Sequence, residues 1–305
     1  MKKLLSLLTC FLLACPLTGR AEDSLTALLP EQIRLAQDIV IETDNPPLYE
    51  YRATLRDFFS CDPSACHAGK IVSTDRFQSE AGHWDDIDYY TFEDGYSLII
   101  SGTSLSMGTA SNECYSQLLI YLRDAEIPVR DLQGEPFPLQ DARERCDRIF
   151  EQFGISGLTA DEVFPLSPET IRDLTKEMRA FYSGCKLACF DDFPEEIGAW
   201  CLSFRQELNG IPVTGDPQVQ AVLTRDKIAL LEMREIIDTV DDQVPLAEGS
   251  DPAEAVRFFA SEHSRFHDEY HESMEINRIS LGYYLEYPQD PSLPMKAGFF
   301  SLLVH

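Results

Sequence analysis

Alternating apolar and polar residues predict strands in the first half of the chain. Residues 48–55 alternate over the length of an ordinary strand. Residues 89–92 and 96–100 carry aromatic and branched side chains, and they flank Glu93-Asp94-Gly95, which is typical of a hairpin turn. We therefore predict a β-rich domain over residues 46–130.

Three segments in this half have weaker patterns. Residues 22–45 form a polar lead-in segment, in which we expect one short helix at 31–36. Residues 101–111 are small and polar, and they fit a loop or a continued strand. Residues 117–122 are apolar and fit either a strand or a helix, because a short apolar run does not distinguish the two.

Helical patterns begin after residue 138. Residues 139–153 place their apolar side chains on one face of a helix, and Gly154 follows as a C-terminal cap. Ser167-Pro168 opens a second helix that runs to about Tyr182, and Ser250-Asp251-Pro252 opens a third through about Glu262. The apolar positions of the first helix are Leu139, Ala142, Cys146, Ile149, Phe150 and Phe153.

Strand patterns alternate with these helices. Residues 200–206 read as a strand that is turned by Asn209-Gly210. Residues 219–223 and 228–233 predict a hairpin, and residues 276–287 predict a further strand rich in Ile, Leu and Tyr. Together with the β-rich first half, this order predicts an α+β fold whose second domain, residues 138–305, has antiparallel strands packed with helices.

The first 21 residues have the pattern of a secretory signal. Lys2 and Lys3 give a basic start, and the apolar run that follows is shorter than the roughly 20 residues of a membrane span. Two processing sites compete, namely cleavage after Ala21 and lipidation of Cys15, which would make residues 1–14 a lipoprotein signal. We therefore expect an extracytoplasmic protein, either secreted or lipid-anchored to the cell membrane.

The excess of acidic residues limits the kinds of molecule that the protein is expected to bind. Removing residues 1–21 leaves 22 basic residues against 52 acidic ones, a formal charge near −30. Such a surface repels phosphate backbones and anionic lipid headgroups, which argues against nucleic-acid binding and electrostatic membrane docking. Membrane contact is then expected only through a lipid anchor, and solubility is the simplest role for the charge.

Seven cysteines follow the signal, so at least one thiol stays outside an intramolecular pair. Cys61 and Cys66 flank Asp62-Pro63, which favours a turn, and we predict a disulfide bond between them. Cys185 and Cys189 are four residues apart and form a second candidate pair. Under reducing conditions all of these thiols would be small buried apolar groups.

The order of motifs in the second half resembles the PepSY-like modules of exported proteins in Gram-positive bacteria, including the YycI-type regulators of sensor kinases. The resemblance rests on Phe204-Arg205-Gln206-Glu207-Leu208-Asn209-Gly210-Ile211-Pro212-Val213, on the helix opening Ser250-Asp251-Pro252-Ala253-Glu254-Ala255, and on Leu281-Gly282-Tyr283. It covers residues 139–305. It departs from the pattern near the end, where residues 294–300 contain no tryptophan.

This resemblance implies a non-catalytic role in binding or regulation outside the membrane, with a membrane or cell-envelope protein as the expected partner. It carries over no functional residues, because the shared positions explain strands and turns. Asn209-Gly210, for example, is explained by a turn that needs positive φ.

The sharpest candidate for chemistry is the histidine segment at residues 262–272. His263, His267 and His271 are spaced four apart among acidic residues, and two such imidazoles on a helix can share a metal with a carboxylate. All three cannot, since positions eight apart on a helix are separated by about 12 Å. Asp268 stands where a His-Glu-x-x-His metalloprotease has its glutamate, so the spacing lacks a proper general base.

No other motif indicates catalysis. The sequence has no Gly-rich phosphate loop and no Gly-x-Ser-x-Gly turn, and Cys185 and Cys189 lack the Cys-x-x-Cys spacing of redox proteins. We therefore expect no catalytic residues and no cofactor, and a non-catalytic binding or regulatory protein of the cell envelope. Two alternatives stay open: a metal-dependent hydrolase or metal-binding protein using the histidine segment, and a disulfide-active protein using Cys185 and Cys189.

Overall fold

A computed structural model describes residues 33–41, 49–77, 86–109, 112–125, 127–181, 198–245, 274–286 and 295–301 of the 305-residue chain. It divides into two compact units. Unit 1 is made of Met1–Arg52, Gly210–Gly215 and Asp241–His305, and unit 2 of Ala53–Asn209 and Asp216–Val240. No helix within the described ranges is both long and apolar enough to cross a membrane.

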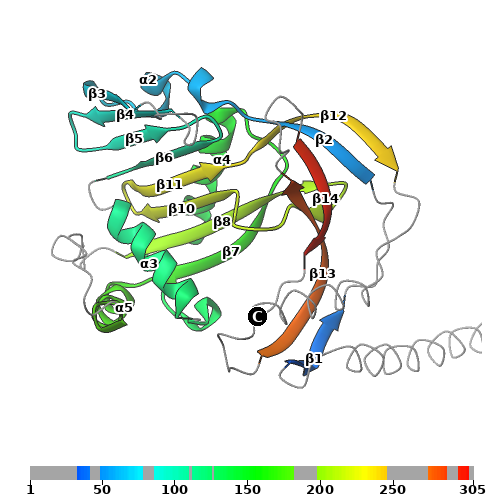
Figure 1. The fold of residues 1–305 in the computed structure, drawn as a ribbon. Helices are drawn as coiled ribbons and strands as arrows, with labels where there is room; N and C mark the ends of the chain where they lie inside the picture. Colours follow the sequence, from blue (N-terminus) through cyan, green and yellow to red (C-terminus); the bar gives the residue numbers. More distant parts are fainter. Residues whose placement is uncertain are drawn as a thin grey trace, which may run out of the picture. The chain divides into compact units, whose positions relative to one another are not determined.

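Unit 2 contains one large antiparallel sheet with helices on its faces, which confirms an α+β fold (Figure 1). The strand order is β3-β4-β5-β6-β11-β10-β8-β7. The strands are β3 Ile71–Phe77, β4 Ile87–Phe92, β5 Ser97–Ile100, β6 Ser104–Gly108, β7 Leu158–Leu166, β8 Ala199–Leu208, β10 Val219–Thr224 and β11 Ile228–Arg234. The predicted hairpins at residues 89–100 and 219–233 are both present, as β4–β5 and β10–β11.

The large sheet crosses the boundary that the sequence places between residues 130 and 138. β6 pairs antiparallel with β11, with Met107 opposite Leu231. Gly108 permits this close approach, because a Cβ there would lie 2.3 Å from the carbonyl oxygen of Ala229. Strands of the predicted first and second domains therefore share one sheet, and the compact units follow contacts in space instead of chain order.

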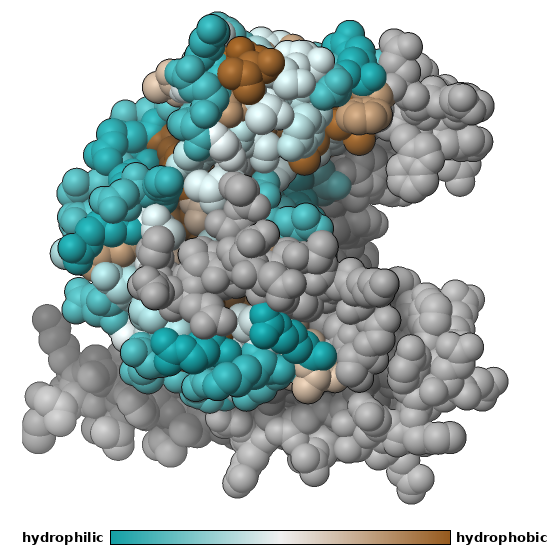
Figure 2. All heavy atoms as spheres, turned by 90° about the vertical axis from the view of Figure 1, so that its left-hand side faces the viewer, coloured by the Kyte–Doolittle hydropathy of each residue, from teal (hydrophilic) through white to brown (hydrophobic). Residues whose placement is uncertain are grey.

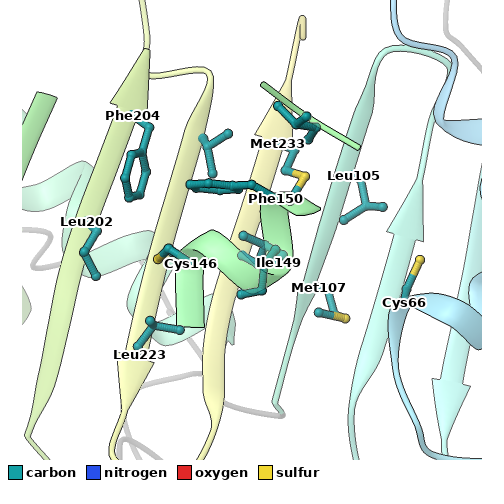
Figure 3. Close-up of a cluster of buried hydrophobic side chains, with 14 of the residues drawn as sticks. Cys66, Leu105, Met107, Cys146, Ile149, Phe150, Leu202, Phe204, Leu223 and Met233 are labelled. Atoms are coloured by element: carbon teal, nitrogen blue, oxygen red, sulfur yellow. The ribbon is translucent and has the colours of Figure 1, made fainter. Parts of the chain in front are cut away.

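The helix α4, Leu139–Phe153, packs on one face of this sheet as its apolar pattern predicts. Figure 3 shows Cys146, Ile149 and Phe150 directed at side chains of β6, β8, β10 and β11. The Phe150 ring meets the Phe204 ring edge-on at 4.8 Å. Gly154 ends the helix in the left-handed conformation with φ of 62°, as predicted.

Two helices cover the other face of the sheet (Figure 1). They are α3, Asn112–Asp124, and α5, Pro168–Phe181. The ambiguous run at residues 117–122 is therefore helical, and Leu118 and Leu122 are buried against this face. Ser167 caps α5, since its hydroxyl oxygen accepts a hydrogen bond from the Thr170 amide at 3.1 Å.

Short elements connect these parts. Before β3, the chain forms the 3-10 helix η1, Phe58–Ser60, and the one-turn helix α2, Pro63–Cys66. A second 3-10 helix, η3, covers Val129–Asp131. Asn209 and Gly210 both have positive φ, 52° and 77°, so the predicted turn after β8 is present.

Unit 1 contains a smaller sheet of order β1-β13-β14-β2-β12. Its strands are β1 Ile33–Ile41, β2 Tyr49–Leu55, β12 Ile237–Pro245, β13 Met274–Glu286 and β14 Met295–Ser301, and the short strand β9, Ile211–Pro212, belongs to the same unit. The strands predicted at 48–55 and 276–287 are confirmed. The helix expected at 31–36 is wrong, because β1 pairs there in parallel with β13 and its backbone hydrogen bonds lie in that ladder.

Candidate functional site

The outermost strand of the large sheet, β3, is the most open element of unit 2. It pairs with β4 on one side and has no second neighbour among the described strands. Six of its seven residues are exposed. Val72 is 57% exposed and Phe77 is 62% exposed, a high value for side chains of this size. We call Ile71–Phe77 the β3 edge.

No pattern of apolar and polar residues predicts this strand. A strand that is exposed on both faces has no reason to alternate apolar and polar residues, and Ser73-Thr74-Asp75-Arg76 is polar throughout. The sequence feature that could have indicated a strand is residue type. Ile71, Val72 and Thr74 are β-branched and Phe77 is aromatic, and such residues favour strands.

Charge on the β3 edge is partly neutralised from within unit 2. The Arg76 guanidinium forms a two-pronged ion pair with Asp88 on β4, with its second nitrogen 2.7 Å from the carboxylate. Hydrogen bonding from Arg76 lowers the pKa of Asp88 below its usual value, against a smaller opposing effect of burial. Asp75, in contrast, is exposed beside them on the outermost strand.

An apolar row continues inward from the β3 edge on the face opposite to α4. The register places Phe77 opposite Ile87, and Tyr89 opposite Ile99, so alternate residues of these strands share that face. In Figure 1, α3 and α5 lie over the strands β7, β8, β10 and β11 on this face. No described helix lies over β4 and β5 on the same face. Figure 2 shows hydrophobic patches among hydrophilic side chains in its upper part, the side of β3 in Figure 1.

A histidine–carboxylate pair lies at the β4–β5 turn. His67 Nε2 is 2.7 Å from Asp94 Oδ2, and this hydrogen bond lowers the pKa of Asp94. The His67 ring stacks on Tyr96 at 4.1 Å and meets Phe92 edge-on at 4.9 Å. No serine, threonine or cysteine hydroxyl or thiol among the described residues hydrogen-bonds to His67. The arrangement therefore fixes the segment before β3 on the core.

Cys61 and Cys66 are free thiols in this structure, and the bond between them in protein folded under oxidising conditions stays a prediction. Asp62 accepts a hydrogen bond from the Ser64 amide at 2.9 Å, which starts the helix α2 and turns Cys66 into the apolar core. Burial raises the pKa of Cys66 to about 12, and burial raises that of Cys146 to about 12 as well. The thiols of Cys66 and Cys146 are therefore protonated and poor nucleophiles at neutral pH.

Other predicted sites lie outside the described residues. These are His263, His267 and His271 of the metal hypothesis, Cys185 and Cys189 of the second disulfide, and Cys15 of the lipid anchor. Within the described ranges, no group of three His, Cys, Asp or Glu side chains is arranged to hold a metal ion.

Two buried glutamines form a pair that no sequence motif indicates. Gln206 on β8 and Gln218 before β10 are 7% and 3% exposed, and their side chains hydrogen-bond to each other at 3.1 Å. Gln206 also binds both backbone groups of Ile237, and Gln218 binds the carbonyl of Glu235. Because every contact goes to backbone or to the other amide, the pair holds the chain after β11 in place.

Comparisons with known proteins identify one protein with a similar fold, and they indicate no function. No model of a known protein family matches the sequence, and no curated protein matches it. A crystal structure of an uncharacterized protein from Eubacterium rectale superposes with a TM-score of 0.55 at 12% identity, over 92% of this chain and 88% of that chain. At this identity the likeness shows a shared fold alone.

Proposed function

We propose that this protein is a non-catalytic binding or regulatory protein of the cell envelope, exported from the cytoplasm, and that it binds a protein partner through the β3 edge. The observation that carries the proposal is the exposure of β3 along one free edge of the large sheet. An edge strand offers a row of backbone donors and acceptors to an extended segment of another chain.

The β3 edge lacks most of the features that protect edge strands from such pairing. It contains no proline and no lysine, and the charge of Arg76 is paired with Asp88. A register shift between Ile71 and Ser73 interrupts only its start, so Ser73–Phe77 pairs regularly with β4. Five regular residues are a usual strand length.

Charge favours a different protein over a second copy as the occupant. The formal net charge of −27 makes two copies repel each other. An extended segment with basic side chains would instead be attracted to Asp75 on the strand. Val72 and Phe77, which are both largely exposed near the two ends of β3, would give that segment apolar contact.

The PepSY-like nature of residues 139–305 is part of the same proposal. In its support, the order α4, β8, turn, β10–β11 hairpin and β13 follows the order of the motifs that suggest the resemblance. The elements are distributed over both units, with β13 in the small sheet.

Site-specific photocrosslinking in the native host tests the proposed surface. A photoreactive phenylalanine analogue at position 72 or 77 should yield one discrete adduct. The same analogue at Phe181, which is 55% exposed on α5, should not. Adding Thr74→Lys, which places an edge-protecting charge in the middle of β3, should remove the adduct and leave the melting temperature unchanged.

Two results would overturn the proposal. One is equal crosslinking at positions 72, 77 and 181, which would indicate random encounter. The other is recovery of the protein in the cytoplasmic fraction, which would exclude a partner in the envelope.

A further inference from the structure

The two outermost strands of the large sheet, β3 and β7, differ in how readily they admit a further strand. β7 contains Pro165, and its pairing with β8 is irregular between Ala160 and Val163. Proline and irregular pairing each hinder the addition of another strand. In β3, Ser73–Phe77 pairs regularly with β4 and contains no proline. A further strand therefore fits at the β3 edge better than at β7.

Successive residues of the β3 edge lie on opposite faces of the sheet. Arg76 pairs with Asp88 and lies on the same face as Tyr90, which packs against the core beneath α4. The Arg76 guanidinium is occupied there by the Asp88 carboxylate. Asp75 and Phe77 lie on the other face. That face therefore carries the exposed groups of β3 for which an added strand can be selected.

Asp75 and Phe77 each lack a matching group on the outer side of β3. The Asp75 carboxylate accepts a hydrogen bond from the Ser73 hydroxyl at 3.4 Å, and no basic side chain of the described residues forms an ion pair with it. Phe77 lies opposite Ile87 on β4 and is still largely exposed. Residues directly opposite each other on one face of a strand pair interact most strongly. A cation therefore suits the position opposite Asp75, and an aromatic side chain suits the position opposite Phe77.

The direction of an added strand follows from the sheet. All of the described strand pairs along the path from β3 to β7 are antiparallel. Antiparallel pairing is slightly more stable for each residue, and sheets of one kind are favoured over mixed ones. A strand that continues this sheet therefore runs antiparallel to β3. In its own direction it meets Phe77 first, then Asp75, then Ser73.

We infer that the β3 edge binds an extended segment in which an aromatic residue, a lysine or arginine, and a serine or threonine occur in this order at every second position. The aromatic ring would lie opposite Phe77, the cation opposite Asp75 and the hydroxyl opposite Ser73. The two residues between them would lie on the face that α4 covers, where polar side chains suffice. The inference rests on the proposed function, because it specifies the segment that the β3 edge would bind.

Three heptapeptides of one composition and charge test the order and the direction. Acetyl-Ser-Phe-Thr-Lys-Thr-Thr-Ser-amide has the inferred order. Acetyl-Ser-Phe-Lys-Thr-Thr-Thr-Ser-amide places its Phe and Lys on opposite faces, and acetyl-Ser-Thr-Thr-Lys-Thr-Phe-Ser-amide is the reversed sequence, which matches β3 only in a parallel pair. In titrations followed by amide NMR, the first peptide should shift the Asp75 and Phe77 signals in a saturable way. It should bind more tightly than the other two by about threefold or more, since each of these loses at least one cross-strand pair.

A charge exchange tests the contact with Asp75. Asp75→Lys should weaken binding of the first peptide by about threefold or more, because like charges directly opposite each other destabilise a strand pair. Replacing the lysine of the peptide by glutamate should restore binding to this variant. Glu135→Lys makes the same change of net charge at an exposed site before α4 and should alter binding by less than about twofold. Asp75 is exposed, so its variant is expected to fold, and circular dichroism checks this.

The inference would be overturned by equal affinities of the three peptides, by the absence of a saturable shift at Asp75 and Phe77, or by a preference for lysine that persists in Asp75→Lys. Tighter binding of the reversed peptide would also overturn it, since the added strand would then be parallel. Failure of the proposed function is a separate result, decided by photocrosslinking in the host. An adduct at positions 72 and 77 together with equal peptide affinities would refute the inferred segment and leave the proposed function standing.

Discussion

Replacing Gln206 by methionine should lower the free energy of unfolding by about 3 kcal/mol. The side chain makes four hydrogen bonds, to the Ile237 amide at 2.7 Å, the Ile237 carbonyl at 2.9 Å, the Gln218 amide at 3.1 Å and the Ser156 carbonyl at 3.3 Å. Methionine keeps the volume and removes all four. Two buried N–H groups then lose their acceptor, at about 1–3 kcal/mol each, which is a large part of the 5–15 kcal/mol typical of folded proteins.

Urea unfolding followed by tryptophan fluorescence measures this loss. Trp200 is a suitable probe because it is buried on β8 and its indole N–H donates to the Phe137 carbonyl at 2.7 Å. Gln140→Met is the matched control, since Gln140 is exposed on α4 and makes one side-chain hydrogen bond to Glu144. The control should change the free energy of unfolding by less than about 0.5 kcal/mol.

Gln206→Glu adds a dependence on pH. Burial and the carbonyl oxygens of Ile237 and Ser156 should raise the pKa of the new carboxyl in the folded state above its unfolded value of about 4.3. The variant should therefore be least perturbed below that value and lose stability as pH rises toward the folded pKa. A cost below about 1 kcal/mol for Gln206→Met, or a pH-independent Gln206→Glu, would refute a structural role for this pair.

Four further predictions concern other residues. Because Arg76 lowers the pKa of Asp88, the stability that Asp88→Asn removes should be present above pH of about 4 and shrink as pH falls through the folded pKa; urea midpoints across that range measure it. Cys66 and Cys146, whose pKa values are each raised to about 12, should resist N-ethylmaleimide at pH of about 8 in folded protein and react in urea, and mass spectrometry that finds both labelled without urea would contradict this. Cell fractionation should find the protein outside the cytoplasm; palmitate labelling lost in Cys15→Ser would indicate a lipid anchor, and an N-terminus at Glu22 would indicate cleavage. Protein purified without an affinity tag should lack stoichiometric zinc, and zinc that disappears in both His267→Ala and His271→Ala would favour the metal alternative.

Elements with one buried face could be predicted from the sequence. The helix α4 carries its apolar side chains at helical spacing, and Ala142, Cys146, Ile149 and Phe150 are buried as that spacing requires. Asn209-Gly210 likewise encodes its own conformation, since both residues tolerate the positive φ they adopt. In both cases the information is local, within a few residues of the element.

Features that depend on distant contacts could not be predicted in this way. The strand β1 mixes apolar and polar residues without a clear alternation, and it owes its conformation to β13, more than 230 residues later. The pairing of β6 with β11 joins the two predicted domains, and no local pattern records it. The β3 edge could not be predicted for a local reason. Its exposure on both faces removes the alternation of apolar and polar residues by which strands are recognised.

The roles of the motif residues also limit what the resemblance to PepSY-like modules can say about function. The side-chain amide of Gln206 hydrogen-bonds to Ile237, Gln218 and Ser156. Asn209 and Gly210 form a turn. Each of these residues is therefore explained by folding, so another protein could share them and bind something different. Function then depends on surfaces that the motif does not encode. On the described part of the chain, the β3 edge is one such surface, and it can be altered by exposed substitutions that leave the shared framework intact.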